Sequence, residues 1–220
     1  MAENETGGDA IKIDPLQIHF FGHSQGSTQG SLALPFSEEI GAAVLSGNGA
    51  SLIDALLTKT SPVDLPSVLP FALSDATATT IGVNHPVLSL LQQWIDPADP
   101  LNFAEPVTRR PIDGGRPKHV FQTFGLGDTY SPPETMRIYA LAGYLSQVEP
   151  EQSELDLPLL APPVYGNVDL EGVYYTLGLR QYEPPSGEDG HFVVFDVNQA
   201  NDDMVHFFET ATAGPPEIGQ

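Results

Sequence analysis

Gly22-His23-Ser24-Gln25-Gly26 has the form Gly-x-Ser-x-Gly, with a serine between two glycines. This pattern is typical of a sharp turn from a strand into a helix, where the serine has strained backbone angles and exposes its hydroxyl. Glycines on both sides would avoid the clashes that side chains make in such a turn. Ser24 is therefore a candidate nucleophile, and the backbone N–H of Gln25 is a candidate oxyanion donor.

A serine nucleophile needs a base, and the base needs a carboxylate that orients it. Asp128 follows a predicted strand at residues 119–124, and His191 follows a predicted strand at residues 173–182. The serine, the acid and the histidine thus occur in the sequence order found in catalytic triads built on this type of turn. We predict that Ser24, Asp128 and His191 form a catalytic triad.

Each of these residues also has a simpler interpretation. Gly-x-Ser-x-Gly occurs by chance in glycine-rich turns, and an aspartate after a strand often serves as a turn residue or helix cap. The agreement of all three positions is what favours catalysis. For the other histidines, a surface or packing role is the better interpretation: His19, His23, His85, His119 and His206.

A metal site is a further possibility on the last predicted helix. Asp202 and Asp203 precede His206 by four and three residues, a spacing that could hold a cation on one helix face. A solvated helix face explains the same spacing better, and Asp96 and Asp99 are interpreted as turn residues. The sequence therefore predicts no metal and no cofactor.

The elements that must position the triad alternate between strand and helix. Apolar runs predict strands at 11–21, 40–46, 119–124 and 173–182. Helices are predicted at 27–34, from Pro132 or Pro133 onward, and at 199–210. This alternation indicates an α/β fold with a parallel sheet of about four strands and covering helices.

The rest of the chain divides into an insertion and two tails. Residues 50–117 interrupt the alternation with helix candidates at 52–57 and 86–95 and proline-rich stretches at 62–70 and 97–111. We interpret this region as a cap over one end of the sheet in a domain covering residues 11–212. Residues 1–10 and 213–220 are polar or rich in glycine and proline, and we expect flexible tails there.

Composition excludes several classes of partner. With 29 acidic and 8 basic residues the formal charge is −21, which repels nucleic acid and anionic lipid. There is no cysteine, so disulfides and thiolate metal sites are excluded. We find no apolar run long enough for a membrane span and no signal-peptide pattern in this chain. The compartment stays open.

The turn at Gly22–Gly26, the Gly127-Asp128 turn before Pro132-Pro133, and Gly190-His191-Phe192 resemble the α/β-hydrolase superfamily. Three stretches further resemble bacterial lipase or esterase-like proteins: His23-Ser24-Gln25-Gly26, the run from Asn84-His85-Pro86 to Trp94, and Asp99-Pro100-Leu101-Asn102.

The resemblance implies hydrolysis of a carboxylic ester through an acyl-enzyme, with a small-molecule or lipid ester as substrate. It also places a lid at residues 50–117. Six apolar residues of that lid are candidates to line an acyl pocket: Leu52, Leu56, Leu57, Phe71, Leu90 and Trp94.

The chain departs from this family at its start, because only 21 residues precede Gly22. Such folds place several strands and a second oxyanion donor ahead of the serine. We therefore expect the C-terminal part of the fold, completed by an N-terminal portion of the same protein. An inactive remnant, and a peptidase or thioesterase with the same triad, are the alternatives.

Overall fold

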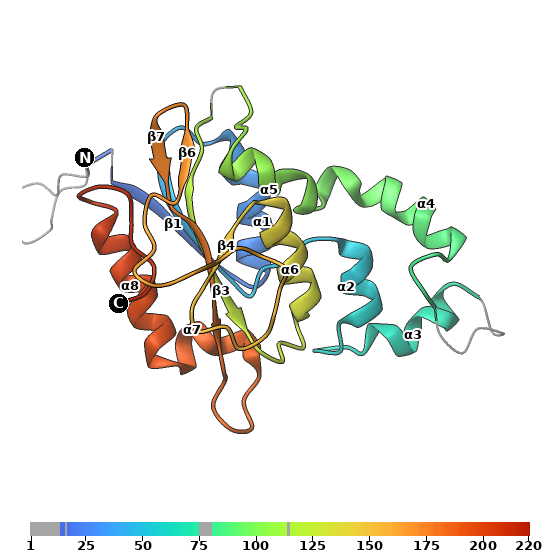
Figure 1. Ribbon diagram of the computed structural model, residues 1–220. Helices are drawn as coiled ribbons and strands as arrows, with labels where there is room; N and C mark the ends of the chain where they lie inside the picture. Colours follow the sequence, from blue (N-terminus) through green and yellow to red (C-terminus); the bar gives the residue numbers. More distant parts are fainter. Residues whose placement is uncertain (1–13, 16, 75–80, 114) are drawn as a thin grey trace, which may run out of the picture.

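The computed structural model describes residues 14–15, 17–74, 81–113 and 115–220 (Figure 1). Its centre is a six-stranded sheet in which each strand is parallel to its neighbours. In spatial order the strands are β1 (Ile18–His23), β2 (Ile40–Ser46), β3 (His119–Gly125), β8 (Leu177–Tyr182), β4 (Ser146–Val148) and β5 (Leu159–Leu160).

The expected α/β class is confirmed, and the sheet has two strands more than the four expected. The extra strands β4 and β5 are three and two residues long, too short to show a period in the sequence. The predicted strand at 173–182 is two elements. Its first part, β7 (Val173–Tyr175), pairs with β6 (Val168–Leu170) in an antiparallel hairpin, and only β8 joins the main sheet.

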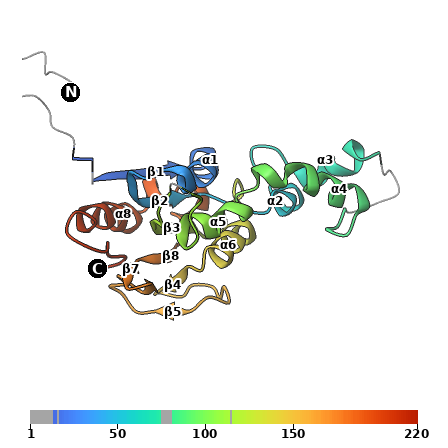
Figure 2. The same cartoon turned by 90° about the horizontal axis from the view of Figure 1, so that it is seen from above.

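Helices cover both faces of the sheet, as Figure 2 shows. On one side lie α1 (Gln25–Ala33), α5 (Leu101–Thr108) and α6 (Pro133–Ala142). On the other lies α8 (Asn198–Thr210), preceded by the short α7 (Val193–Asp196). The described residues also form three 3₁₀ turns: η1 (Leu34–Phe36), η2 (Asp96–Ala98) and η3 (Gly190–Phe192).

Alternate residues of the central strands supply two separate cores. In β2, Ala43 and Leu45 belong to the core beneath α5 and α6, whereas Ala42 and Val44 belong to the core beneath α8. A strand buried on both faces reads as a continuous apolar run, which is why 40–46 was recognisable in the sequence.

The segment between β2 and β3 carries α2 (Leu52–Thr58), α3 (Leu65–Ala72) and α4 (Pro86–Ile95), which extend away from the sheet beyond α5 and α6 (Figure 2). Helices α3 and α5 fall in stretches that the prolines led us to expect as irregular. Pro66 is tolerated because the first turn of a helix needs no N–H donor there. Pro106 lies inside α5, which is held by the buried residues Ala104 and Val107.

The C-terminal end differs from the expected flexible tail. Ile218 is fully buried in the core beneath α8 and exchanges two backbone hydrogen bonds with Val164, of 3.0 and 2.9 Å. The hydroxyl of Thr176 donates to the carbonyl of Pro216 at 2.6 Å. The expected tail at 1–10 lies outside the described residues. No helix in the described ranges has the length and apolar character needed to cross a bilayer.

Candidate active site

Ser24 lies between the end of β1 and the first residue of α1, as the sequence predicts. Its φ of 56° and ψ of −127° fall in a region that side chains other than glycine rarely adopt. The strain is held by hydrogen bonds: the Ser24 N–H donates to the Ser46 carbonyl at 2.8 Å, and the N–H groups of Ser27 and Thr28 donate to the Ser24 carbonyl. The turn thus exposes Ser24 at the carboxyl edge of the sheet.

The two glycines of the turn differ in their surroundings. A Cβ on Gly22 would lie 2.7 Å from the Cα of Ser27, so a side chain there would displace the backbone. A Cβ on Gly26 would meet no atom within 4 Å. The expectation that both glycines relieve a clash is therefore wrong for Gly26. Gly30, one turn further along α1, is the closer-packed position, because its Cβ would overlap the ring of Phe20.

Asp128 and His191 are in direct contact although 63 residues separate them. The His191 Nδ1 lies 2.9 Å from Asp128 Oδ2 and 3.1 Å from Oδ1, and both side chains are almost fully buried. Asp128 Oδ1 also accepts the backbone N–H groups of Tyr130 and Ser131 at 2.8 and 2.7 Å. The carboxylate therefore has a fixed orientation, and it holds the imidazole with Nε2 directed away from it.

His191 lies beside the serine turn. Its ring centre is 4.8 Å from that of His23, the neighbour of Ser24 in sequence. A Cβ on Gly47, just after β2, would lie 2.8 Å from His191 Cε1, so the backbone passes close to the imidazole. Among the described residues no hydrogen bond joins the Ser24 hydroxyl to His191. Such bonds are often long in the absence of substrate and shorten in the reacting complex.

The ring of His23 packs against that of His191 and is neutral. Burial, and next the nearby His191, lower the pKa of His23 to about 4. Its Nδ1 lies 3.1 Å from the hydroxyl of Ser46 on the neighbouring strand. Because His23 is uncharged near neutral pH, it packs against His191 without adding a positive charge beside that ring.

Two residues that the sequence reasoning missed fix the position of His191. Tyr130 stacks on the His191 ring at 4.7 Å. Asp189 accepts the backbone N–H of His191 at 2.8 Å and both the N–H and the hydroxyl of Thr129 at 3.2 and 2.5 Å. Burial favours the neutral acid, but these hydrogen bonds together hold the pKa of Asp189 below its usual value. Its place two residues before His191 was the available signal.

The other candidate residues have partners elsewhere. The ring of His19 stacks on Phe208, and His119 accepts the Thr176 N–H at 3.0 Å. Asp203 contacts Arg180 and Tyr182, each at 2.6 Å, whereas His206 lies 3.2 Å from Glu217. In the part of the chain that the structure describes, no cluster of three or more such side chains could hold a metal.

Asp99, expected as a turn residue, has a larger structural part. It is fully buried, and its carboxylate accepts the N–H groups of Ser51 and Leu52 at 2.9 and 2.7 Å at the start of α2. This contact joins the beginning of the insertion to its last turn before α5. The first residues of α2 are thereby held against the turn that precedes α5.

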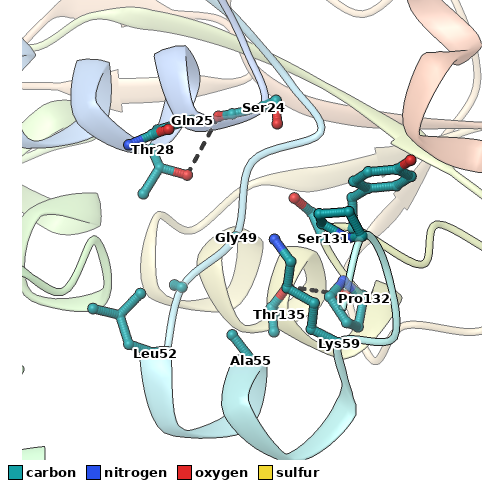
Figure 3. Close-up of a pocket in the computed structure, with 13 residues that line it drawn as sticks. Ser24, Gln25, Thr28, Gly49, Leu52, Ala55, Lys59, Ser131, Pro132 and Thr135 are labelled. Carbon is teal, nitrogen blue, oxygen red and sulfur yellow. Dashed lines mark hydrogen bonds between the residues drawn. The ribbon is translucent and has the colours of Figure 1, made fainter. Parts of the chain in front are cut away.

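Ser24 opens into a cavity of about 430 Å³ (Figure 3). Its lining comes from the serine turn and α1, the segment after β2, α2 and the residues that follow it, the loop after β3, and the first turn of α6. The described lining residues are Ser24, Gln25, Thr28, Gly49, Ala50, Leu52, Ala55, Lys59, Pro62, Tyr130, Ser131, Pro132 and Thr135. Gln25, the predicted oxyanion donor, is the first residue of α1, where a backbone N–H has no partner within the helix.

The cavity differs from the acyl pocket expected from the sequence. Of the six apolar residues proposed for that pocket, only Leu52 is among the described lining residues. Phe71, Leu90 and Trp94 lie farther out on the insertion and are 85%, 66% and 81% exposed. Apolar periodicity identified the helices but did not show which of their faces meets the site.

Comparison with solved structures finds similar folds at low sequence identity. Acylaminoacyl peptidase from Pyrococcus horikoshii matches with a TM-score of 0.50 and 12% identity, covering 94% of this chain and 25% of that one. Acetyl xylan esterase 1 from Thermoanaerobacterium sp. matches at 0.49 and 16%, covering 91% and 47%. A puromycin-hydrolyzing peptidase from Mycobacterium tuberculosis matches at 0.49 and 16%, covering 90% and 22%.

The chain thus spans less than half the length of each of these structures. No family model matches the sequence, and no curated protein shows significant similarity to it. What the comparison and the architecture establish is the fold. The parallel sheet, with the serine turn after β1 and helices on both faces, gives this chain the fold of the α/β-hydrolases.

Proposed function

We propose that this chain is the catalytic part of a serine hydrolase that cleaves carboxylic esters through an acyl-enzyme. Ser24 is the nucleophile, His191 the base and Asp128 the residue that orients the base. The observation that carries the proposal is the buried contact between Asp128 and His191 beside a strained Ser24 that opens into a cavity.

In the first half of the reaction, the Ser24 oxygen attacks the ester carbonyl carbon while His191 Nε2 takes the hydroxyl proton. The resulting oxyanion accepts the backbone N–H of Gln25. Collapse of this intermediate breaks the ester C–O bond, and the alcohol leaves with the proton from His191.

In the second half, water attacks the acyl-enzyme. His191 takes a proton from the water and returns it to Ser24 as the acyl–serine bond breaks. One ester and one water become one acid and one alcohol. No step in this cycle needs a cofactor or metal.

We propose an ester substrate, and not a peptide or a thioester, because of the family resemblance in the sequence. The arrangement of Ser24, Asp128 and His191 would suit all three reactions. Segment 50–117 serves as the cap of this site. Its inner part, from Ala50 to Pro62, contributes lining residues of the cavity.

Full activity requires a further segment beside β1, which we propose is an N-terminal portion of the same protein. Within the described residues β1 pairs with β2 alone, and its Phe21 is 40% exposed. The open space next to Gly26 lies in the same turn. A strand added at this edge would satisfy unpaired backbone groups and could bring a second oxyanion donor.

Hydrolysis of p-nitrophenyl acetate and p-nitrophenyl valerate by the 220-residue chain and by its Ser24→Ala variant tests the proposal. We expect turnover by the parent protein, and a loss in kcat of about 10⁴-fold or more in the variant. Turnover that survives in Ser24→Ala would exclude Ser24 as the nucleophile.

The inactive-remnant alternative predicts something different. It requires that the parent chain show no turnover, or no cooperative thermal unfolding. A cooperative melt together with Ser24-dependent turnover would therefore eliminate that alternative.

A further inference from the structure

Lys59 is the one charged side chain among the described residues that line the Ser24 cavity. It follows the last residue of α2, and Figure 3 shows its ammonium end directed up into the cavity, on the side where Ser24 lies. The protein has 29 acidic and only 8 basic residues. The described lining of the cavity contains a lysine and no acidic residue, so its charge is positive although the protein as a whole is strongly negative.

Three of the hydroxyl groups that line the cavity, those of Thr28, Ser131 and Thr135, donate their protons to main-chain carbonyls. Thr28 donates to the Ser24 carbonyl, Ser131 to the Gly47 carbonyl at 2.6 Å, and Thr135 to the Pro132 carbonyl at 2.7 Å. These side chains can accept hydrogen bonds from a ligand, but they cannot donate to one without losing a contact to the main chain.

The ammonium group of Lys59 differs from these hydroxyl groups in its hydrogen bonding. Within the described ranges its ammonium group makes no ion pair and no side-chain hydrogen bond. An ammonium group carries three donors and no acceptor, and it is only partly buried here. Its matching partner in a half-enclosed cavity is an anionic oxygen, because charge-assisted hydrogen bonds are stronger than neutral ones.

We propose that Lys59 binds a carboxylate on the substrate, so that the preferred substrates are monoesters of short dicarboxylic acids. The ester group would sit at Ser24 and the free carboxylate at Lys59, within the same cavity. This inference rests on the proposed function for turnover, but the binding that it predicts does not require turnover. Lys59 acts here as a specificity residue.

Binding is measured in the Ser24→Ala background by NMR titration, with monomethyl glutarate as the anionic probe and methyl valerate as the neutral probe of the same acyl length. Lys59→Met should weaken binding of monomethyl glutarate about tenfold and leave methyl valerate unchanged. The Lys59→Arg variant should keep most of the affinity for monomethyl glutarate.

Arg110→Met is the matched control for loss of one positive charge. The side chain of Arg110 is 80% exposed and does not line this cavity. Its removal should change neither affinity. Binding of monomethyl glutarate that is absent, or that is equal in the parent and Lys59→Met, would overturn the proposal.

Kinetics in the Ser24 protein separate binding from a role in catalysis. Mono-p-nitrophenyl glutarate and p-nitrophenyl valerate share a leaving group and a five-carbon acyl chain. Lys59→Met should lower kcat/KM about tenfold for the first alone, and thermal unfolding of each variant checks folding. An equal loss for both esters would assign Lys59 to the oxyanion or to the fold instead. If Ser24 proved not to be the nucleophile, the binding result would still stand or fall by itself.

Discussion

The backbone conformation at Ser24 is strained for any residue that carries a Cβ. A non-glycine residue with φ of 56° and ψ of −127° costs on the order of 1–3 kcal/mol. Replacing Ser24 with alanine keeps this cost, because alanine also carries a Cβ. The Ser24→Ala protein should therefore keep the stability of the parent, so that a loss of activity in it reports chemistry alone.

His23 and His119 make stability depend on pH in a defined window. Burial first, then His191 for one and Arg116 for the other, lowers each pKa from 6.5 to about 4. Between these pH values the two histidines are protonated in the unfolded chain but not in the folded one. The free energy of unfolding should therefore fall as pH drops from about 6.5 to about 4. Urea unfolding at several pH values measures this.

The double variant His23→Gln, His119→Gln should show a flatter profile over the same window. NMR titration provides an independent check, because the ring protons of His23 should titrate near pH 4. A midpoint close to 6.5 would contradict the burial that we assign to this ring.

At the scale of elements, the site depends on the close approach of β1 and α1 at the turn. Gly22→Ala would bring a methyl group within 2.7 Å of the Ser27 Cα and 2.9 Å of its N. We expect a loss of about 1–3 kcal/mol in the free energy of unfolding, because the backbone of α1 must move.

Gly26→Ala is the matched substitution on the other side of the same serine. Its methyl group meets open space inside a helix, where alanine is favoured over glycine by roughly 0.5–1 kcal/mol. Chemical denaturation of both variants should show opposite signs. Equal destabilisation would mean that both glycines are required, as the sequence pattern alone suggested.

The loops that carry Asp128 and His191 also act as one unit. Asp189 ties them together, since it binds the main chain on both sides of the pair. Each loop follows a strand that is parallel and adjacent to the other, β3 and β8. Their ends therefore lie at the same edge of the sheet, and a single carboxylate can join them.

For the molecule as a whole, the C-terminal end is part of the core. Ile218 is fully buried among Val164 and residues of the sheet and α8. Ile218→Ala should lower the free energy of unfolding by about 2–5 kcal/mol, as expected for deletion of a buried aliphatic side chain. Val205→Ala, at a position that is 43% exposed, should change it by less than about 0.5 kcal/mol.

Urea denaturation of the two variants compares these values directly. If residues 213–220 were the loose tail that their glycines and prolines suggest, Ile218→Ala would behave like Val205→Ala.

Four strands of the main sheet, β1, β2, β3 and β8, were predictable from the sequence because each has a local signature. The same holds for the helices α1, α2, α4, α6 and α8 and for the candidates Ser24, Asp128 and His191. A strand buried on both faces is a continuous apolar run, and a serine flanked by glycines is typical of one kind of turn. Chain order then limited the choice of acid and base.

Other features depended on contacts between distant segments, which leave no local period. Only the tertiary structure decided that β8 lies between β3 and β4, that Asp189 joins two loops, that Lys59 faces Ser24, and that Ile218 closes a core. Each of these contacts joins residues that are far apart in the sequence and is determined by packing and charge in the folded protein. A short stretch of sequence does not show which distant residues it will contact.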